Sequence, residues 1–211
     1  MFTTLDIELN GPVATIWMNR PDLHNAFDET LITELTAACM ALDDDADVRV
    51  VVLAGRGKSF SAGADLNWMK RAANNGLDDN LNDARALAHM LRTLAEMKKP
   101  TIARVQGAAL GGGMGLMQGA AIRIVTPSSR LGMPEINIGL FPDVGGSWFL
   151  ARLPGKLGLF LGLGVADVAD MQDQIGFQHF FQRSQLIYLA HCLRAQVNMS
   201  KVLLIQRLIR S

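Results

Sequence analysis

Two short apolar runs in this chain are each followed by a stretch that is rich in glycine. The first stretch, residues 59–65, reads Ser-Phe-Ser-Ala-Gly-Ala-Asp and follows the apolar run at residues 49–54. The second, residues 107–115, reads Gly-Ala-Ala-Leu-Gly-Gly-Gly-Met-Gly and follows the run at residues 101–105. Apolar runs of this length indicate buried strands. Because the glycine-rich stretches carry little side-chain bulk, their backbone N–H groups stay open to a ligand, and two such groups aimed at one oxygen form an oxyanion hole.

Strand and helix signals alternate along most of the chain. Asn10-Gly11 lies between two apolar runs and predicts a β-hairpin. Asp28 is placed to cap a helix that runs to about Leu42. The remaining pattern predicts strands at residues 49–54, 101–105 and 122–125, and helices at about 65–73, 78–97, from within 111–115 and through 148–153. Strands that alternate with helices in this way predict an α/β fold with right-handed crossovers.

The composition argues against several classes of protein. Hydrophobic residues make up 49% and charged residues 19% of the 211 residues, which is enough for a sizeable core. Lys+Arg and Asp+Glu are both 20, so the chain lacks the basic excess of a nucleic-acid-binding protein. The cysteines and histidines fit no metal-ligand spacing, and no segment resembles a signal peptide or a membrane span. We therefore expect a cytoplasmic protein with no metal, no membrane span and no nucleic-acid partner.

The character of the sequence changes near Gly164. Residues 175–211 contain no Asp or Glu but carry five Lys or Arg residues, and their leucines recur at near-helical spacing. This pattern predicts a basic, amphipathic helical tail over residues 165–211, after a core domain of residues 1–164. We expect the tail to pack on the core or on a second subunit; binding to a membrane surface or an acidic partner is the alternative.

Three motifs occur in an order and at separations that resemble one known family. They are Asn-Arg-Pro at residues 19–21 with Asn-Ala at 25–26, Phe-Ser-Ala-Gly-Ala-Asp-Leu at 60–66, and Pro-Thr-Ile-Ala at 100–103 with Gly-Ala-Ala-Leu-Gly-Gly-Gly at 107–113. Together they resemble the enoyl-CoA hydratase/isomerase (crotonase) superfamily. The resemblance implies a crotonase-like spiral of ββα units that binds an acyl-CoA thioester and stabilises its enolate oxygen.

The resemblance assigns four catalytic candidates. The oxyanion-hole N–H groups map to Ala64 and Gly112, where two fixed amides and a helix N-terminus would stabilise charge on one oxygen. The catalytic carboxylates map to Glu135 and Asp143, although an aspartate before a helix is also a common cap. Hydratases of the superfamily usually carry a further glutamate two positions after the triple glycine, where this chain has Gly115.

The substrate-binding candidates lie around the first two motifs. They are Leu23, His24, Ala26, Ala62, Asp65, Leu66 and Trp68. The alternative role for Trp68 is packing in the core, and the alternative for His24 is an ordinary exposed loop position. Arg20 is a candidate contact to phosphate, with a solvated charge as the alternative. Coenzyme A is expected as part of the substrate, so no separate cofactor is implied.

Two parts of the sequence resemble different reactions within the superfamily. Residues 13–117 resemble methylglutaconyl-CoA-type hydratases, whereas residues 118–163 resemble the 3-hydroxyisobutyryl-CoA hydrolase branch, which also has glycine at the position of Gly115. Enoyl-CoA hydration is the first expectation, and thioester hydrolysis by Glu135 and Asp143 is the alternative. A further alternative is an inactive acyl-CoA-binding or assembly paralogue. A homotrimer or hexamer is expected if the tail substitutes for the C-terminal helices of the superfamily.

Overall fold

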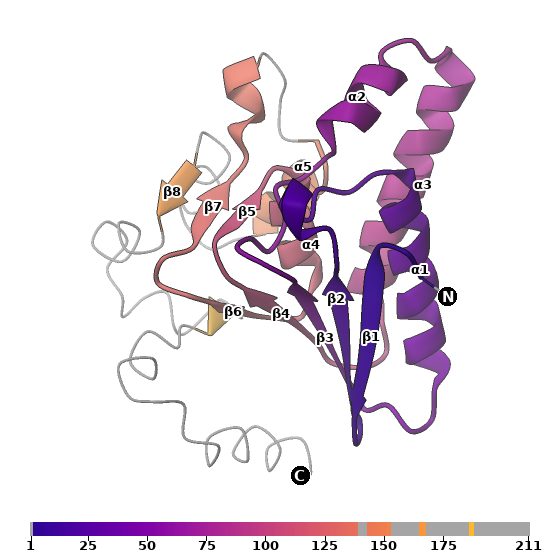
Figure 1. Cartoon of the computed structure of the whole chain (residues 1–211), viewed down its shortest axis with the longest axis vertical. Coiled ribbons are helices and arrows are strands. Elements are labelled where there is room, and N and C mark those ends of the chain that lie inside the picture. Colours follow the sequence, from indigo (N-terminus) through magenta and orange to yellow (C-terminus); the bar gives the residue numbers. More distant parts are fainter. Residues whose placement is uncertain (1, 139–142, 153–164, 168–185, 188–211) are drawn as a thin grey trace.

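A six-stranded sheet forms the frame of the fold (Figure 1). The computed structural model describes residues 2–138, 143–152, 165–167 and 186–187. The strands of this sheet lie in the order β1-β2-β3-β4-β6-β9, with bounds Leu5–Asn10, Val13–Met18, Val50–Gly55, Thr101–Val105, Ile122–Val125 and Leu186–Ile187. β1 and β2 are antiparallel, and every later neighbouring pair is parallel. Parallel pairing on both sides explains why β3 is an almost continuous buried apolar run.

The hairpin at the start of the sheet follows from its turn residues and its alternation. Gly11 in the turn has a φ of +55°, a left-handed conformation that glycine adopts without steric cost. In β2, Ala14, Ile16 and Met18 are buried, whereas the residues between them are partly exposed. One face of the sheet therefore faces the core.

Two long helices pack beside the sheet. α1 (Glu29–Asp44) and α3 (Leu77–Ala95) contact each other (Figure 1). Asp28 caps α1 as predicted, because its carboxylate accepts hydrogen bonds from two amides of the first turn. The short helix α2 (Leu66–Ala72) is capped by Asp65 in the same way. No helix in the described ranges is long and apolar enough to cross a membrane.

A second, three-stranded sheet carries the rest of the described chain. It is formed, in this order, by β5 (Ala108–Leu110), β7 (Arg130–Gly132) and β8 (Val165–Asp167). The helices that follow are α4 (Gly112–Gly119), η2 (Pro134–Ile138), α5 (Gly146–Phe149) and η3 (Leu150–Arg152), and η1 (Pro21–Leu23) follows β2. Strand, strand and helix thus recur as β1-β2-α1, β4-β5-α4 and β6-β7-η2. This recurrence matches the predicted ββα repeat.

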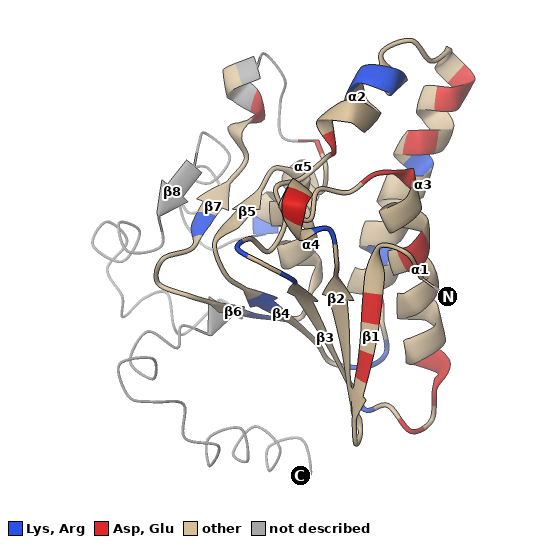
Figure 2. Cartoon of the chain, viewed as in Figure 1, with Lys and Arg blue, Asp and Glu red and all other residues tan. Residues whose placement is uncertain are grey.

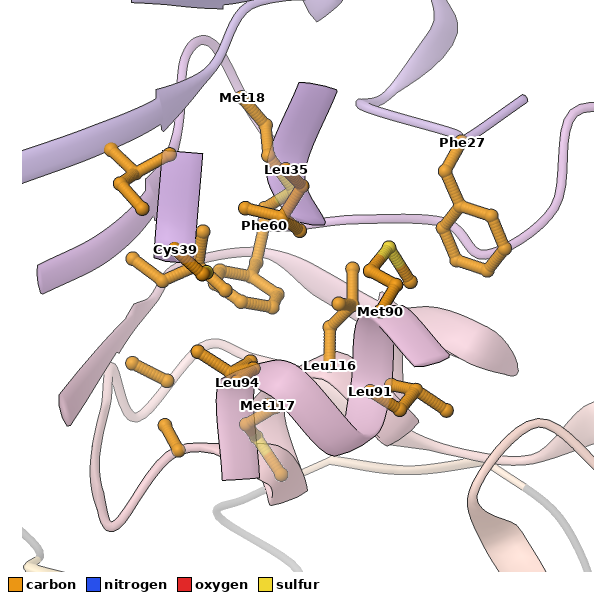
Figure 3. Packing of buried hydrophobic residues seen from close by; sticks show 14 of the residues in the cluster. Met18, Phe27, Leu35, Cys39, Phe60, Met90, Leu91, Leu94, Leu116 and Met117 are labelled. Carbon is orange, nitrogen blue, oxygen red and sulfur yellow. The ribbon is translucent and has the colours of Figure 1, made fainter. Parts of the chain in front are cut away.

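Large apolar side chains join the helices to the strands. Figure 3 shows Leu35 and Cys39 of α1, Leu94 of α3 and Leu116 of α4 in one buried cluster with Phe60. Burial raises the pKa of the Cys39 thiol to about 12, so the thiol stays protonated and acts as a small apolar group. The cluster therefore fixes α4, whose first turn lies within the second glycine-rich stretch.

The predicted helical tail differs from the structure where the two can be compared. Val165–Asp167 forms β8, which pairs with β7, and Leu186–Ile187 forms β9, which pairs with β6. The helix predicted over residues 165–211 is therefore wrong at these two segments. Helical spacing of leucines takes no account of open strand edges, which offer unpaired backbone groups to a neighbouring segment. The rest of the tail, and with it the predicted domain boundary at residue 164, lies outside the described residues.

Leu35→Ala should destabilise the fold strongly, because Leu35 is 0% exposed and its truncation leaves a cavity. We expect the free energy of unfolding, measured by urea denaturation, to fall by about 2–5 kcal/mol. Met40→Ala is the matched control on the same helix; Met40 is 52% exposed. It should cost about 0.5 kcal/mol or less. Equal losses in the two variants would contradict the packing of α1.

Candidate active site

The first glycine-rich stretch is held by the segment that precedes α1. Ala64 forms an isolated parallel bridge with Phe27. The Phe27 N–H donates to the Gly63 carbonyl at 2.8 Å, and the Asp65 N–H donates to the Phe27 carbonyl at 2.9 Å. In such a pair the residue between the two bonds directs its own N–H and C=O to the opposite side. The Ala64 amide therefore points away from Phe27.

The second glycine-rich stretch lies against the first. The Ser61 N–H donates to the Ala108 carbonyl at 3.1 Å, and the Leu110 N–H donates to the Ser61 carbonyl at 3.0 Å. A Cβ atom added to Gly63 would lie 3.2 Å from the Gly112 nitrogen, so the backbones touch beside the two predicted amides. Gly63 also has a φ of +91°, which favours glycine. The structure thus brings together the two stretches that the sequence places far apart.

The two predicted oxyanion-hole amides are free of hydrogen bonds to the described residues. No group in the described part of the chain accepts a hydrogen bond from the Ala64 N–H or the Gly112 N–H. Gly112 is the first residue of α4, so its amide also carries the partial positive charge of a helix N-terminus. Free amides of this kind stabilise negative charge on a ligand oxygen.

Glu135 lies beside these amides on η2. A Cβ atom added to Gly111 would lie 2.8 Å from Oε1 of Glu135, which places the carboxyl against the second stretch. Its other oxygen, Oε2, is buried and has no hydrogen-bond partner among the described residues. Burial raises the pKa of Glu135, and the charge of Asp143 raises it further. A raised pKa makes a carboxylate a better proton acceptor, so Glu135 is a candidate general base and, once protonated, a candidate general acid.

Asp143 is exposed and acts on Glu135 through its charge. Its Oδ1 accepts a hydrogen bond from the Val144 N–H at 2.8 Å. The alternative role of Asp143 as a helix cap is wrong, because the residue that caps α5 is Gly145, which has a φ of +76°.

Gly115 has no room for the glutamate that many hydratases carry there. A Cβ atom at this position would lie 2.2 Å from the Val144 carbonyl oxygen. Real Cβ atoms do not approach backbone atoms so closely, so any side chain at Gly115 requires the turn at residues 143–145 to move. The missing carboxylate is therefore a property of the local backbone as well as of the sequence.

The predicted substrate-binding residues lie on two adjacent segments, residues 23–26 and residues 62–68, the second of which includes the start of α2. The Ala62 N–H donates to the His24 carbonyl at 2.9 Å, so the loop at residues 23–26 lies beside the first glycine-rich stretch. Leu23 is 45% exposed and Leu66 is 70% exposed, as expected for side chains open to a ligand. The His24 Nδ1 lies 3.0 Å from the Ser59 hydroxyl. Coenzyme A binding by this group stays a prediction.

Arg20 is an ion-pair partner, which argues against the predicted phosphate contact. Its Nη2 lies 3.0 Å from Oδ2 of Asp28 and 2.9 Å from Oδ2 of Asp65, and its Nη1 donates to the Ala26 carbonyl. Each aspartate uses its other oxygen to cap a helix, α1 or α2. We call Arg20, Asp28 and Asp65 the arginine clamp. The clamp joins the starts of the two helices that flank Phe27 and Ala64.

The clamp engages the side chain of Asp65, which was predicted to face coenzyme A. Burial alone would raise the pKa of Asp65, but hydrogen bonds from the Asn67 and Trp68 amides and from Arg20 outweigh it. The pKa of Asp65 therefore lies below its ordinary value of 3.8. Trp68 is partly buried and packs against the core, which agrees with its alternative role.

Sequence reasoning missed the roles of Asn25 and Phe27. Asn25 is fully buried; its Oδ1 accepts from the Arg20 N–H, and its Nδ2 donates to the carbonyls of Arg56 and Ser59 at 2.8 Å each. It therefore ties its own loop, which begins at Arg20, to the loop that follows β3. Its place in the Asn-Ala motif was the available signal, since a buried asparagine needs such partners. Phe27 gave no signal, because a single aromatic residue before a helix resembles any core residue.

The chain matches one family over most of its length. A family model described as enoyl-CoA hydratase/isomerase matches residues 13–209. The chain therefore belongs to the enoyl-CoA hydratase/isomerase family, which confirms the predicted superfamily and its fold.

Similar proteins include both kinds of enzyme that the sequence suggests. The mitochondrial 3-hydroxyisobutyryl-CoA hydrolase of Rattus norvegicus is 37% identical over 158 residues, which cover 74% of this chain and 41% of that protein. A protein named "Probable enoyl-CoA hydratase" from Rhizobium meliloti is 39% identical over 155 residues, which cover 74% of this chain and 58% of that protein. The chain thus spans about half the length of these relatives. The solved enoyl-CoA hydratase of Shewanella pealeana superposes with a TM-score of 0.76 at 34% identity, covering 82% of this chain and 66% of that one.

Glu135→Gln should have a higher free energy of unfolding, relative to the wild type, at neutral pH than at acidic pH. Because the native pKa of Glu135 is raised above 4.5, its favourable contribution to folding is present below that pH and is lost as the pH rises through the native pKa. Glutamine does not ionise and avoids this loss. Urea denaturation across the pH range should show the variant gaining on the wild type as the pH rises. A constant difference between the two proteins would contradict the raised pKa.

Arg20→Met should cost about 3 kcal/mol in the free energy of unfolding, because it leaves two largely buried carboxylates without their counter-ion. The side chains of Arg20 and Asp65 are 17% and 8% exposed. The matched control is Arg92→Met, which breaks an exposed ion pair with Glu96 and should cost about 0.5 kcal/mol or less. Thermal or urea unfolding measures both, and similar losses would argue against a structural role for the arginine clamp.

Proposed function

We propose that this chain catalyses the hydration of an enoyl-CoA thioester. The observation that carries the proposal is the meeting of two free amides, from Ala64 and Gly112, with one carboxyl of raised pKa, Glu135. The amides suit the thioester carbonyl oxygen, and the carboxyl suits a proton that must be taken from one atom and given to another.

The proposed reaction runs through a stabilised enolate. The oxygen of a water molecule bonds to the β-carbon of the enoyl group, and the electrons of the double bond move to the thioester oxygen. The Ala64 and Gly112 amides donate hydrogen bonds to that oxygen, each contributing about 3 kcal/mol to the transition state. Glu135 accepts the proton that water releases and delivers it to the α-carbon as the carbonyl re-forms. The sum is the addition of H and OH across the double bond.

The absence of a second buried carboxylate at Gly115 fits a mechanism in which one group does both proton transfers. Glu135 can perform both because a carboxylate that has accepted a proton can then donate it, and its raised pKa makes it a better proton acceptor. The proposal is also supported by the similarity to the protein named "Probable enoyl-CoA hydratase" from Rhizobium meliloti, which is 39% identical over 155 residues.

Thioester hydrolysis is the second candidate. The blocked position at Gly115 and the electrostatic coupling of Glu135 to Asp143 favour it. In that reaction the same amides would stabilise the tetrahedral oxyanion formed when water adds to the thioester carbonyl, and the thiol of coenzyme A would leave.

The proposal also covers the substrate class, the cofactors, the location and the oligomeric state. We propose an acyl-CoA from fatty acid or branched-chain amino acid metabolism as the substrate, no metal or redox cofactor, and a cytoplasmic location. We propose a homotrimer or hexamer if the tail substitutes for the C-terminal helices of the superfamily. Figure 2 shows acidic residues on β1 and α1 and basic residues on α2 and β4. The equal totals of Lys+Arg and Asp+Glu, 20 each, support the absence of a nucleic-acid partner.

Incubation with crotonyl-CoA should bleach the absorbance of the conjugated thioester without releasing free thiol. Glu135→Gln should lower kcat by about 10²- to 10⁴-fold, the usual contribution of a general acid/base. Glu96→Gln, a matched change of an exposed glutamate on the far end of α3, should leave kcat unchanged.

The same assay with 3-hydroxyisobutyryl-CoA separates the alternatives. Release of free thiol that is lost in Glu135→Gln would favour hydrolysis over hydration. Binding of both thioesters without turnover would favour an inactive acyl-CoA-binding protein, and absence of binding would overturn the proposed function.

A further inference from the structure

Phe27 contacts both halves of the candidate oxyanion hole. Its backbone N–H and C=O are bonded to the residues on either side of Ala64, at 2.8 Å and 2.9 Å. These two bonds fix the plane and direction of the Ala64 amide. Phe27 itself is 0% exposed, so its backbone and ring are both inside the protein.

The ring of the same residue lies against the other donor. A Cβ atom added to Gly112 would lie 2.2 Å from Cζ and 2.8 Å from Cε1 of Phe27. The far end of the ring therefore rests on the Gly112 backbone. On another side, the same Cβ position lies 3.0 Å from Cγ1 of Val144. Gly112 thus sits between two apolar side chains and cannot shift toward Phe27.

We propose that Phe27 is a positioning residue that sets the separation and orientation of the Ala64 and Gly112 amides. Its backbone places one amide and its ring supports the other, so the length of one side chain fixes the distance between the two donors. The inference rests on the proposed function, because it assigns a role within that oxyanion hole. Phe27 touches neither the substrate carbonyl nor the reacting atoms.

The surroundings of Phe27 make it a rigid support. The arginine clamp joins Asp28, the next residue, to Asp65, which follows Ala64. On the other side of Phe27, the Arg20 guanidinium donates to the Ala26 carbonyl. Phe27 is therefore held from both sides of its backbone, and a displacement of its ring would be passed to Gly112.

An ordinary role in the core is the competing explanation, and it makes a different prediction. Figure 3 places Phe27 at one side of the buried cluster, away from Cys39 and Phe60. A core residue affects stability and leaves the geometry of bound ligand unchanged in the molecules that stay folded. A positioning residue changes how strongly the bound carbonyl is polarised.

The test is the infrared carbonyl stretch of a bound, unreactive probe. The probe is a saturated acyl-CoA analogue in which CH₂ replaces the thioester sulfur and the carbonyl carbon is ¹³C, so neither hydration nor hydrolysis can consume it. In the wild type, two hydrogen bonds should move the stretch to lower wavenumber. In Phe27→Leu, which keeps the backbone bonds but shortens the side chain, at least half of this displacement should be lost.

Kinetics give the second readout. Phe27→Leu should lower kcat by about 10²-fold, as expected for a small displacement of a catalytic group, while KM for the acyl-CoA stays within about threefold. Leu35→Ala is the control, because it removes a larger share of a fully buried side chain on α1. It should reduce stability yet keep the carbonyl displacement and the kcat of the folded protein.

The outcomes separate this inference from the proposed function. No displacement in the wild type would overturn the oxyanion hole and the role of Phe27 together. A displacement that is present in the wild type and unchanged in Phe27→Leu would overturn the role of Phe27 alone. If Phe27→Leu does not fold, Phe27→Met places a flexible, unbranched side chain in the same space and should still lose part of the displacement. Full retention in that variant would also overturn the inference.

Discussion

The contact between two glycine-rich backbones is the constraint on which the rest of the site depends. β3 and β4 are parallel neighbours, so the stretches that follow them leave the sheet at the same edge. A Cβ atom at Gly63 would lie 2.9 Å from the Leu110 carbonyl oxygen, and one at Gly113 would lie 2.2 Å from the Ser61 carbonyl oxygen. Side chains at these positions would separate the stretches and, with them, the two free amides. The sheet brings the stretches together, and the missing side chains allow the final approach.

Local sequence signals predicted the fold well, because they report local physics. Strands β4 and β6 have the predicted bounds, and Asp28 caps α1 as its position suggested. The same reasoning indicated open amides in the two glycine-rich stretches, and the family resemblance picked out Ala64 and Gly112, whose role stays a prediction. It could not find the arginine clamp, since Arg20 and its partners are joined by tertiary packing and an arginine in a loop is usually solvated. It also misassigned the cap of α5 and the segments that form β8 and β9, where the deciding contacts come from distant parts of the chain.

Polar groups around the site differ in whether they have hydrogen-bond partners among the described residues. Those that hold the loops are fully engaged: Asn25 uses both ends of its amide, and Asp65 uses one oxygen for a helix and one for Arg20. Glu135 is different, because its Oε2 is buried without a partner in the described part of the chain and its pKa is raised. An unsatisfied buried oxygen lowers stability, and a native protein tolerates it where a ligand or water completes the bonding. The burial that lowers stability also raises the pKa of Glu135, which makes the carboxylate a better proton acceptor.

The Val144 carbonyl, which lies against Gly115, limits the substitutions by which this site can evolve. A two-glutamate site cannot arise here by a single substitution, because the new side chain would collide with the backbone at 2.2 Å before it could contribute any chemistry. The turn at residues 143–145 must be rebuilt first, by insertion, deletion or a change in its glycines. The main chain therefore imposes the order of the mutational steps. Descendants of this sequence that keep the turn cannot place a second glutamate at this position.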